Sequence, residues 1–288
     1  MIDAKYSQLR EMLRGFGSCV IAYSGGVDSV FLAAVAHEIL GDRSLAVIAD
    51  SPSLPRRELR EALEIAEQFQ FPVCVATTAE FADERYLANP GNRCYFCKHA
   101  LFTELIPLAR AGGFAVIAYG ENASDVGEHR PGAQAAAEFQ IRAPLKEVGL
   151  TKAEIRELSA RLNLPTADKP QLACLSSRIP TGEAVTVQKL RMIEEAEYHL
   201  RDLGFHDVRV RHHEITGGHL ARIEVGPEEL GRLIASGSSS RIAEQFRSLG
   251  YQQVTLDLAG YRRGSTNGQP ASTAVPISFR VSDPALAR

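Results

Sequence analysis

Residues 20–29, with the sequence VIAYSGGVDS, constrain the fold of this chain more than any other stretch. Four residues typical of a buried strand lead into a turn of small residues, and an apolar run with a helix-like pattern follows at once. The adjacent Gly25 and Gly26 let the backbone pass close to a ligand, and the first amides of a helix have no partner within the helix. Those amides, the helix dipole and the hydroxyls of Ser24 and Ser29 together predict a binding site for an anion, most naturally phosphate.

Asp28 adds a second constraint on this loop. A carboxylate beside a phosphate site is repulsive unless a cation such as Mg²⁺ lies between them. No Gly-Lys-Ser/Thr sequence closes the loop, so it is not a Walker A motif. Residues 24–29 resemble instead the SGGxDS loop of the ATP pyrophosphatase (PP-loop) families, whose members cleave ATP to AMP and pyrophosphate. A Ser/Gly turn that only caps a helix is the alternative, and the strand before the loop and the helix after it disfavour it.

Strand patterns alternate with helix patterns up to Tyr119. We expect strands over residues 20–23, 44–50, 71–76 and 114–119, and helices over residues 1–15, 30–40, 55–70 and 97–111. This alternation predicts an α/β fold, a Rossmann-like parallel sheet with helices on both faces. Ligands bind such sheets at the carboxyl ends of the strands, so the Ser24 loop, Asp50 with Ser51, and residues 120–122 should converge there.

A second, smaller α+β domain is expected after residue 182. We predict a helix over residues 185–203, strands over residues 207–213, 220–225 and 252–258, and a helical stretch over residues 227–249 with a break at residues 236–240. In the first strand, Val208 and Val210 should face inward, with Arg209 and Arg211 on the other face. The predicted division is a PP-loop domain over residues 1–180, an α+β domain for substrate binding or oligomerisation over residues 183–262, and a disordered tail over residues 264–288.

Composition disfavours several classes of function. The formal net charge of −3 gives no overall attraction to nucleic acid or to an anionic membrane. Residues 1–10 carry charges and lack the apolar core of a signal peptide, and no apolar run is long enough to span a bilayer. The five cysteines lack the frame of a small secreted protein and indicate a reducing compartment. We therefore expect a cytoplasmic protein without a membrane partner.

Cys94 and Cys97 form a pair at the start of a predicted helix. The helix terminus and the neighbouring Arg93 and Lys98 should lower the pKa of both thiols and favour thiolates. Such a pair suits a redox couple, a zinc half-site or an iron–sulfur half-site. Two incidental thiols near a helix cap are the alternative.

The other cysteines lie in different surroundings. Cys19 and Cys74 fall at or within predicted strands, where small buried side chains are expected. Cys174 falls in a stretch that its composition marks as a loop, beside Arg178. Such an electropositive setting is what a nucleophilic thiolate needs, although a lone loop cysteine commonly has no special role.

Several stretches, taken in their order along the chain, resemble the LarE family of ATP-dependent sulfur transferases. They are the PP-loop, residues 92–98, residues 120–125 with 130–132, residues 174–182, residues 208–213 and residues 221–225. The resemblance covers roughly residues 1–264. It implies an enzyme of nickel-pincer nucleotide cofactor synthesis, which adenylylates a carboxylate of pyridinium-3,5-biscarboxylic acid mononucleotide and then replaces its oxygen with sulfur.

The resemblance also implies roles for individual residues. For ATP and Mg²⁺ it implies Ser24, Gly25, Gly26, Asp28, Ser29, Asp50, Ser51, Gly120, Asn122 and Asp125. Lys98 would neutralise phosphate or the adenylate, Cys174 would attack the acyl-adenylate, and Arg178 would assist ionisation of the thiol or bind anionic substrate. For the phosphate and carboxylates of the substrate it implies Arg209, Arg211 and Glu224. A solvated strand face is the alternative for the two arginines.

Cys94, Cys97 and Cys174 leave the source of the sulfur open. One subgroup of the family holds a [4Fe–4S] cluster with three cysteines, and three ligands leave one iron open to carry the transferable sulfur. The other subgroup lacks the pair and consumes the loop cysteine, which becomes dehydroalanine. With all three cysteines present, this chain resembles the cluster type. A sacrificial mechanism with the pair as bystanders is the alternative.

Other functions stay open at this point. Some tRNA-thiolating PP-loop enzymes also use three cysteines and a cluster, but this chain has no strongly basic patch and no zinc-ribbon pairs. An amidotransferase-type synthetase would leave the three cysteines unexplained, and a nucleotide-binding sensor would hold ATP without turning it over. The family suggests a small-molecule nucleotide substrate and a homo-oligomer, with a hexamer among the arrangements. His212 and His213 are expected to be a solvent-facing pair without an assigned role.

Overall fold

The computed structural model describes residues 2–125, 131–170 and 173–261. Its first sheet contains four strands in the order β3-β2-β1-β4, and every pairing is parallel. The strands are β1 (Cys19–Tyr23), β2 (Ser44–Asp50), β3 (Val73–Thr77) and β4 (Val116–Tyr119). The predicted parallel sheet is therefore confirmed.

The order in which the chain adds strands to the sheet reverses at β1. From β1 the chain moves outward to β2 and β3, and then returns to the other side of β1 as β4. Cys19 is accordingly opposite Ser44 in β2 and opposite Val116 in β4. Ligands of open parallel sheets bind outside the carboxyl ends of the strands at such a switch point, and the PP-loop follows β1 there.

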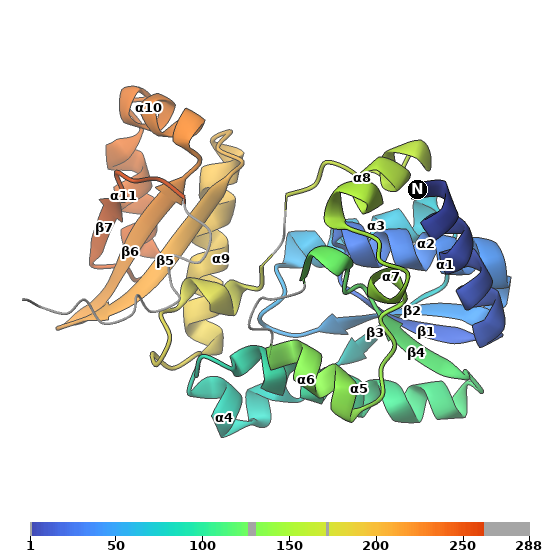
Figure 1. Cartoon of the computed structure of the whole chain (residues 1–288). Coiled ribbons are helices and arrows are strands. Elements are labelled where there is room, and N and C mark those ends of the chain that lie inside the picture. The colour runs from blue at the N-terminus through green and yellow to red at the C-terminus, as the bar shows by residue number, and fades with distance from the viewer. Residues whose placement is uncertain (1, 126–130, 171–172, 262–288) are drawn as a thin grey trace, which may run out of the picture.

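Helices cover both faces of this sheet (Figure 1). Core residues of α1 (Ile2–Phe16), α2 (Val27–Leu40), α3 (Arg56–Gln68), α7 (Pro144–Glu147) and α8 (Lys152–Arg161) form one cluster with the sheet. On the opposite face, α5 (Arg93–Ala111) and α6 (Pro131–Glu138) pack on Val20, Ala22 and Val47. Short helical turns connect these elements: η1 (Gly41–Arg43), η2 (Glu80–Ala82), α4 (Glu84–Leu87), η3 (Ala123–Asp125) and η4 (Leu175–Arg178).

Several element boundaries differ by a few residues from the sequence-based expectation, and two of these differences bear on the site. The third strand begins at Val73 rather than at Phe71, because the amide of Phe71 still closes the end of α3 by donating to the Ala66 carbonyl. The helix expected over residues 97–111 begins at Arg93, so that both Cys94 and Cys97 lie in its first two turns. The expected elements did not include α4, α6, α7 or α8.

The second sheet forms a separate α+β layer. It comprises β5 (Val208–Ile215), β6 (Gly218–Val225) and β7 (Gln253–Leu256), with β5 and β6 antiparallel and β6 and β7 parallel. One face packs against α9 (Val187–Asp202), α10 (Pro227–Ala235) and α11 (Ser239–Ser248), and its core includes Val208 and Val210 (Figure 1). The break between α10 and α11 falls within the predicted one.

The arginine face of β5 departs from the solvated alternative. Arg209 is 6% exposed and Arg211 is 4% exposed, although the valines alternate with them as predicted. Both faces of this strand are therefore covered. The second face is lined by charged rather than apolar side chains.

A further apolar cluster joins the two layers. Tyr86 from α4 packs with Leu175 and Ile179, and with residues of α9 that include Leu190. Between α3 and α9, the amide of Arg57 donates to the Tyr198 hydroxyl over 2.8 Å. The domain boundaries 1–180 and 183–262 stay a prediction, and the tail at residues 264–288 lies outside the described residues. Among the residues described, no helix combines the length and hydropathy needed to cross a membrane.

Candidate active site

The PP-loop is shaped by two glycines and two hydroxyls. Gly25 has a φ of +71°, and a Cβ added there would lie 2.7 Å from the Cβ of Ala62, so a side chain would be strained on two grounds. The Ser24 and Ser29 hydroxyls lie 3.1 Å apart, and the Ser29 hydroxyl donates to the Gly26 carbonyl over 3.1 Å. Gly26 is the N-cap of α2 and has no side chain to cap its first amides. The geometry thus suits an anion at the helix N-terminus.

The end of β4 lies directly against this loop. A Cβ on Gly120 would be 3.0 Å from the Ser29 amide nitrogen and 3.1 Å from the Asp28 carbonyl carbon. At the end of β2, Asp50 pairs with Arg56, and the Ser51 hydroxyl lies 2.8 Å from that of Ser53. The expected convergence of strand ends at one edge of the sheet is therefore observed.

Asp28 lies in an acidic corner next to the loop. Its Oδ2 is 2.7 Å from the Nζ of Lys152, whereas its Oδ1 is buried and has no hydrogen-bond partner within the described residues. Burial raises the pKa of the Asp28 carboxyl, Lys152 acts in the opposite direction, and nearby Asp125 raises the pKa further. An unpartnered carboxylate oxygen with a second carboxylate nearby is a donor set that fits Mg²⁺.

Lys98 lies at the same edge of the sheet. Its Nζ is 4.5 Å from the centroid of the Tyr119 ring, at the end of β4, and 5.5 Å from that of Phe102. The Tyr119 hydroxyl donates to Glu121, which also pairs with Lys146. Lys98 therefore contributes positive charge beside the carboxyl end of β4.

The loop of Cys174 is tied to the PP-loop side of the molecule. Lys169, which precedes it, lies 2.9 Å from carboxylate oxygens of both Glu58 and Glu61, and 3.5 Å from the Gly25 carbonyl. On the other side of Cys174, the amide of Leu175 donates to the Ser53 carbonyl over 2.8 Å. The half-buried Cys174 is thus held beside the end of β2.

Arg93 links the Cys94 and Cys97 helix to the same loop. Its Nη1 donates to the Ser176 carbonyl over 3.0 Å, and its charge interacts with the thiols of Cys174, Cys94 and Cys97. The three cysteines are therefore neighbours around one half-buried guanidinium, although they lie in two distant parts of the sequence.

The prediction of a lowered thiol pKa is wrong for Cys97. Burial raises the pKa of this thiol well above its usual range, and Cys174, Glu80 and Cys94 raise it further, while Lys98 acts in the opposite direction. Cys97 is therefore a thiol in the unligated protein. An iron or another cation bound to sulfur would reverse this balance, because coordination deprotonates a thiol outright.

The cysteines do not form a mononuclear metal site. No three or more His, Cys, Asp or Glu side chains converge on a single metal position within residues 2–125, 131–170 and 173–261. In an iron–sulfur cluster each thiolate binds a different iron, so its ligands surround the cluster instead of meeting at one point. Three neighbouring cysteines with Arg93 among them are a donor set that fits such a cluster.

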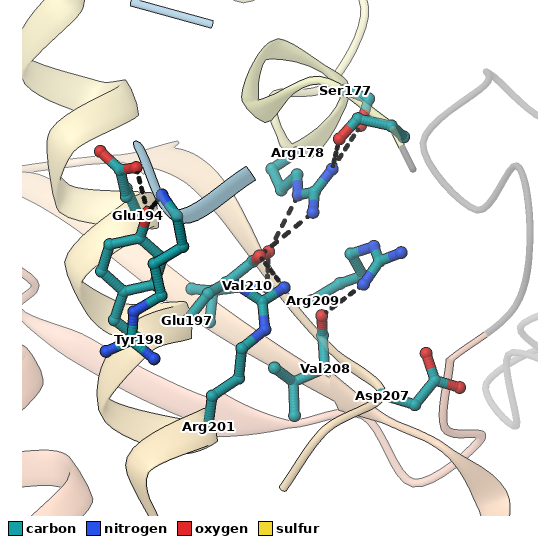
Figure 2. Close-up of polar contacts among 12 residues, drawn as sticks. Ser177, Arg178, Glu194, Glu197, Tyr198, Arg201, Asp207, Val208, Arg209 and Val210 are labelled. Carbon is teal, nitrogen blue, oxygen red and sulfur yellow. Dashed lines mark hydrogen bonds and ion pairs between the residues drawn. The ribbon is translucent and has the colours of Figure 1, made fainter. Parts of the chain in front are cut away.

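Arg178 is held by a buried carboxylate and by the Cys174 loop itself (Figure 2). Its Nε and Nη2 donate to Glu197 over 2.9 and 3.1 Å, and its Nη1 donates to the carbonyls of Ala173 and Cys174 over 2.6 and 3.1 Å. Burial alone would raise the pKa of Glu197, but Arg178 and Arg201 hold it below its usual value.

Substrate binding by Arg178 is not what this geometry supports. All three nitrogens of its guanidinium donate to protein oxygens, and only 2% of the residue is exposed. It instead binds the Ala173 and Cys174 carbonyls and so fixes the backbone on both sides of the Cys174 side chain.

Arg209 and Arg211 differ in their partners. Arg211 lies 2.8 Å from Glu224 and donates to the Ser177 carbonyl over 3.0 Å. Among the described residues, Arg209 donates only to the Val208 carbonyl, 2.7 Å away (Figure 2). Its guanidinium also lies over the Tyr261 ring. No carboxylate pairs with Arg209 in the described part of the chain. Burial lowers the pKa of its guanidinium, and the charge of Arg178 lowers it further.

Comparison with known proteins identifies the family. Residues 2–84 match the NAD synthase family model. The chain is 43% identical to an uncharacterised protein of Synechocystis sp., over 93% of this chain and 98% of that protein. It is 32% identical to the pyridinium-3,5-bisthiocarboxylic acid mononucleotide synthase of Lactiplantibacillus plantarum, over 92% of this chain and 95% of that protein.

The chain belongs to the LarE family. It is an ATP-using enzyme with a PP-loop domain. A weaker similarity, 27% identity over 57% of this chain and 33% of the relative, links it to the GMP synthase of Acinetobacter baylyi. That match and the NAD synthase model reflect the shared PP-loop fold.

Three sequence-based expectations about other residues of this LarE protein need correction or comment. His212 is fully buried and lies 3.2 Å from the Tyr251 hydroxyl, and His213 is half-buried, so the expected solvent-facing pair is wrong. Cys19 is buried as expected, and burial raises its pKa to about 12. Cys74 lies in the edge strand β3 and is only half-buried.

The sequence-based expectations missed several polar residues at this LarE site. Lys152, Glu197 and Tyr86 were not among them, although each contacts an expected residue or its loop. Only Lys152 had a local signal: Thr151 and Glu154 form a capping box that begins α8 at Lys152. The partners of Glu197 and Tyr86 depend on tertiary packing alone.

Proposed function

We propose that this LarE-family enzyme is an ATP-dependent sulfur transferase acting on pyridinium-3,5-biscarboxylic acid mononucleotide. It would adenylylate a carboxylate of the substrate, release pyrophosphate and replace the adenylate by sulfur, in the synthesis of the nickel-pincer nucleotide cofactor. The observation that carries the proposal is the placement of the Cys174 loop. It is hydrogen-bonded to the end of β2 through Ser53 and to β5 through Arg211, between the PP-loop and the arginine face.

Activation of the carboxylate would take place at the PP-loop. An oxygen of the substrate carboxylate forms a bond to the α-phosphorus of ATP, and the bond to the bridging oxygen breaks, so that pyrophosphate leaves with the electron pair. Ser24, Ser29 and the first amides of α2 would bind that pyrophosphate. Bound Mg²⁺, held by Asp28, would supply further neutralisation of the leaving group. The carboxyl ends of β2 and β4, with Asp50 and Asn122, would flank the nucleotide.

Sulfur transfer would take place at the Cys174 loop. A sulfur nucleophile attacks the acyl carbon, and AMP leaves with its electron pair. In the sacrificial version the nucleophile is the Cys174 thiolate, and loss of the Cα proton then breaks the Cβ–S bond, which leaves a thiocarboxylate on the product and dehydroalanine in the chain. Arg178, through its bonds to the Ala173 and Cys174 carbonyls, would hold the loop during attack.

The three cysteines support the cluster version. Cys94, Cys97 and Cys174 would hold a [4Fe–4S] cluster, which would supply a labile sulfide at the iron left without a protein ligand. Their common neighbour Arg93 would balance part of the negative charge of the thiolates. In this version Cys174 survives each turnover.

The arginine face would bind the substrate. Arg209 is a buried cation without a carboxylate partner in the described chain, which favours a phosphate or carboxylate ligand. Arg211 and Glu224 would form the wall of that site, since they already pair with each other. The homo-oligomer stays a prediction.

Iron and sulfide analysis after anaerobic purification tests the cluster version. Wild type should be brown and hold about four irons per chain, and Cys94→Ala, Cys97→Ala and Cys174→Ala should each lose the cluster. Cys74→Ala is the matched control and should retain it. A colourless anaerobic preparation that forms product in a single turnover, with dehydroalanine at position 174 by mass spectrometry, would exclude the cluster version and support the sacrificial one.

An amide-forming synthetase is the second candidate function. The NAD synthase model and the similarity to a GMP synthase favour it, because both point to PP-loop proteins whose names denote synthases. This candidate predicts that AMP release depends on ammonia and is insensitive to Cys174→Ala. Sulfide-dependent product formation without ammonia would exclude it.

A further inference from the structure

The ion pair between Lys152 and Asp28 joins two parts of the chain that no sequence pattern connects. The Nζ of Lys152 lies 2.7 Å from Oδ2 of Asp28, and both side chains are mostly buried, at 29% and 19% exposed. Asp28 is the second residue of α2, and Lys152 is the first residue of α8. The ammonium therefore lies at the carboxylate that the proposed function assigns to Mg²⁺.

The backbone of Lys152 is fixed by four contacts around it. Thr151 caps α8 and forms a capping box with Glu154, and Glu154 pairs with Lys5 of α1 over 2.8 Å. The amide of Lys152 itself donates to the Ser124 hydroxyl over 2.9 Å. These contacts hold the backbone but not the side chain of Lys152, which is long enough to leave Asp28 without unfolding α8.

Charge explains why a lysine is present there. Burial and the nearby charge of Asp125 both disfavour the ionised form of Asp28, so a cation in contact with Asp28 stabilises its carboxylate. The Lys152 ammonium supplies that cation in the protein without metal. A divalent cation at the unpartnered Oδ1 of Asp28 would lie beside the ammonium at Oδ2, and two positive charges so close together are repulsive.

We propose that Lys152 is a resident counter-cation that excludes free divalent metal from Asp28, so that the metal enters only with nucleotide phosphates that draw Lys152 away. The inference rests on the proposed function only in its assignment of Asp28 to the metal. It makes ATP binding and metal binding mutually dependent, as linkage requires, and it prevents the enzyme from trapping a metal without its substrate.

Mn²⁺ binding measured by electron paramagnetic resonance tests this proposal on the full-length protein without nucleotide. Mn²⁺ prefers the same oxygen ligands as Mg²⁺. Lys152→Gln should bind Mn²⁺ about tenfold more tightly than wild type, within the range typical of coupling between sites. Lys146→Gln is the matched control, because Lys146 pairs with Glu121 over 3.0 Å in the same region, and it should leave Mn²⁺ affinity unchanged.

The double variant Asp28→Asn/Lys152→Gln completes the test. It should lose the tighter Mn²⁺ binding of Lys152→Gln, which would show that the gained affinity belongs to Asp28. An unchanged or weaker Mn²⁺ affinity in Lys152→Gln, with native circular dichroism, would overturn the proposal. The measurement needs no pyridinium substrate and no sulfur source, so failure of the sulfur-transfer function would leave its result intact.

Discussion

The PP-loop and the arginine face are built in opposite ways. The PP-loop relies on the backbone, because two glycines and the uncapped amides at the start of α2 form it. Within the described residues, its two hydroxyls contact each other and the backbone of the loop. The arginine face of β5 and the adjoining Cys174 loop rely on contacts between residues far apart in sequence, such as Arg211 with Ser177 and Arg178 with Glu197. A backbone site binds what every ATP-using relative shares, whereas a side-chain site can differ between enzymes with different acceptors.

In the proposed function, this difference also separates activation of the carboxylate from transfer of sulfur. The ATP side can be complete without Cys174, since Ser24, Asp28 and Gly120 converge without any contribution from the second layer. The Cys174 loop is complete only when α9 and β5 are in place, because Glu197 and Arg211 hold it. Variants in the two regions should therefore fail at different steps.

The largest effect is expected for Cys174→Ala. Formation of the sulfur-containing product should fall by at least about 10³-fold, since the nucleophile or cluster ligand is lost. Pyrophosphate release with the carboxylate substrate should persist, because the PP-loop does not depend on this thiol. Product by mass spectrometry and pyrophosphate by a coupled assay give both values, with Cys74→Ala as the control. Loss of both steps to the same extent would break the separation between the two regions.

Glu197→Gln should strongly destabilise the α+β layer that contains α9 and β5. Removing this carboxylate leaves the buried Arg178 without a charge partner, and breaking a buried pair costs about 3–5 kcal/mol. Urea unfolding measures the free energy of unfolding. Asp202→Asn on the same helix is the control, because its pair with Arg57 is exposed, and it should unfold at the same urea concentration as wild type.

The same pair gives a pH dependence with a defined sign. The pKa of Glu197 is lowered in the folded protein. The ionised carboxylate therefore contributes stability above its unfolded pKa of about 4.3, and this contribution is lost as the pH falls through the lower folded value. Wild type should lose more stability than Glu197→Gln on acidification below about pH 5. Parallel losses in the two proteins would show that another carboxylate dominates.

Arg209→Met should weaken substrate binding without weakening the fold. Arg209 forms no ion pair with a carboxylate in the described residues, so replacing it removes a buried charge without breaking such a pair, while binding loses about 1.5–3 kcal/mol of charged hydrogen bonds. Calorimetry with the mononucleotide should show a roughly tenfold to hundredfold weaker affinity. Arg211→Met is the contrasting variant, since it leaves the buried Glu224 less paired and should lower stability as well. Unchanged affinity in Arg209→Met would place the substrate elsewhere.

The sequence predicted the PP-loop side well because its signals are local. The glycines, the strand ends and the helix after residues 24–29 translate into positions through the general geometry of parallel sheets. The same geometry places Gly120 beside the loop. In the structure, a Cβ added to Gly120 would lie 3.0–3.1 Å from atoms of Asp28 and Ser29. Each of these steps needs only a strand, its end and its neighbour.

The arginine face was predictable only in part because it depends on tertiary pairing. Alternation placed Arg209 and Arg211 on one face of β5, but nothing local indicated that the face is buried. Arg178 looked available to substrate because Glu197, its partner, lies 19 residues further along, on α9. His212 was expected in solvent, and its burial against Tyr251 requires α11 and the turn after it.

The smallest effect tests whether the PP-loop is a backbone site. Gly25→Ala should lower the free energy of unfolding by about 1–2 kcal/mol, because an L-residue is strained at a φ of +71°, and its Cβ also meets Ala62. Gly26→Ala is the matched control next to it: its φ is −84°, and its Cβ would lie 3.5 Å from the Ser24 hydroxyl, an ordinary contact. Thermal unfolding without nucleotide should therefore separate the two variants. Equal losses would mean that side-chain contacts rather than backbone conformation hold the loop, and the contrast with the arginine face would fail.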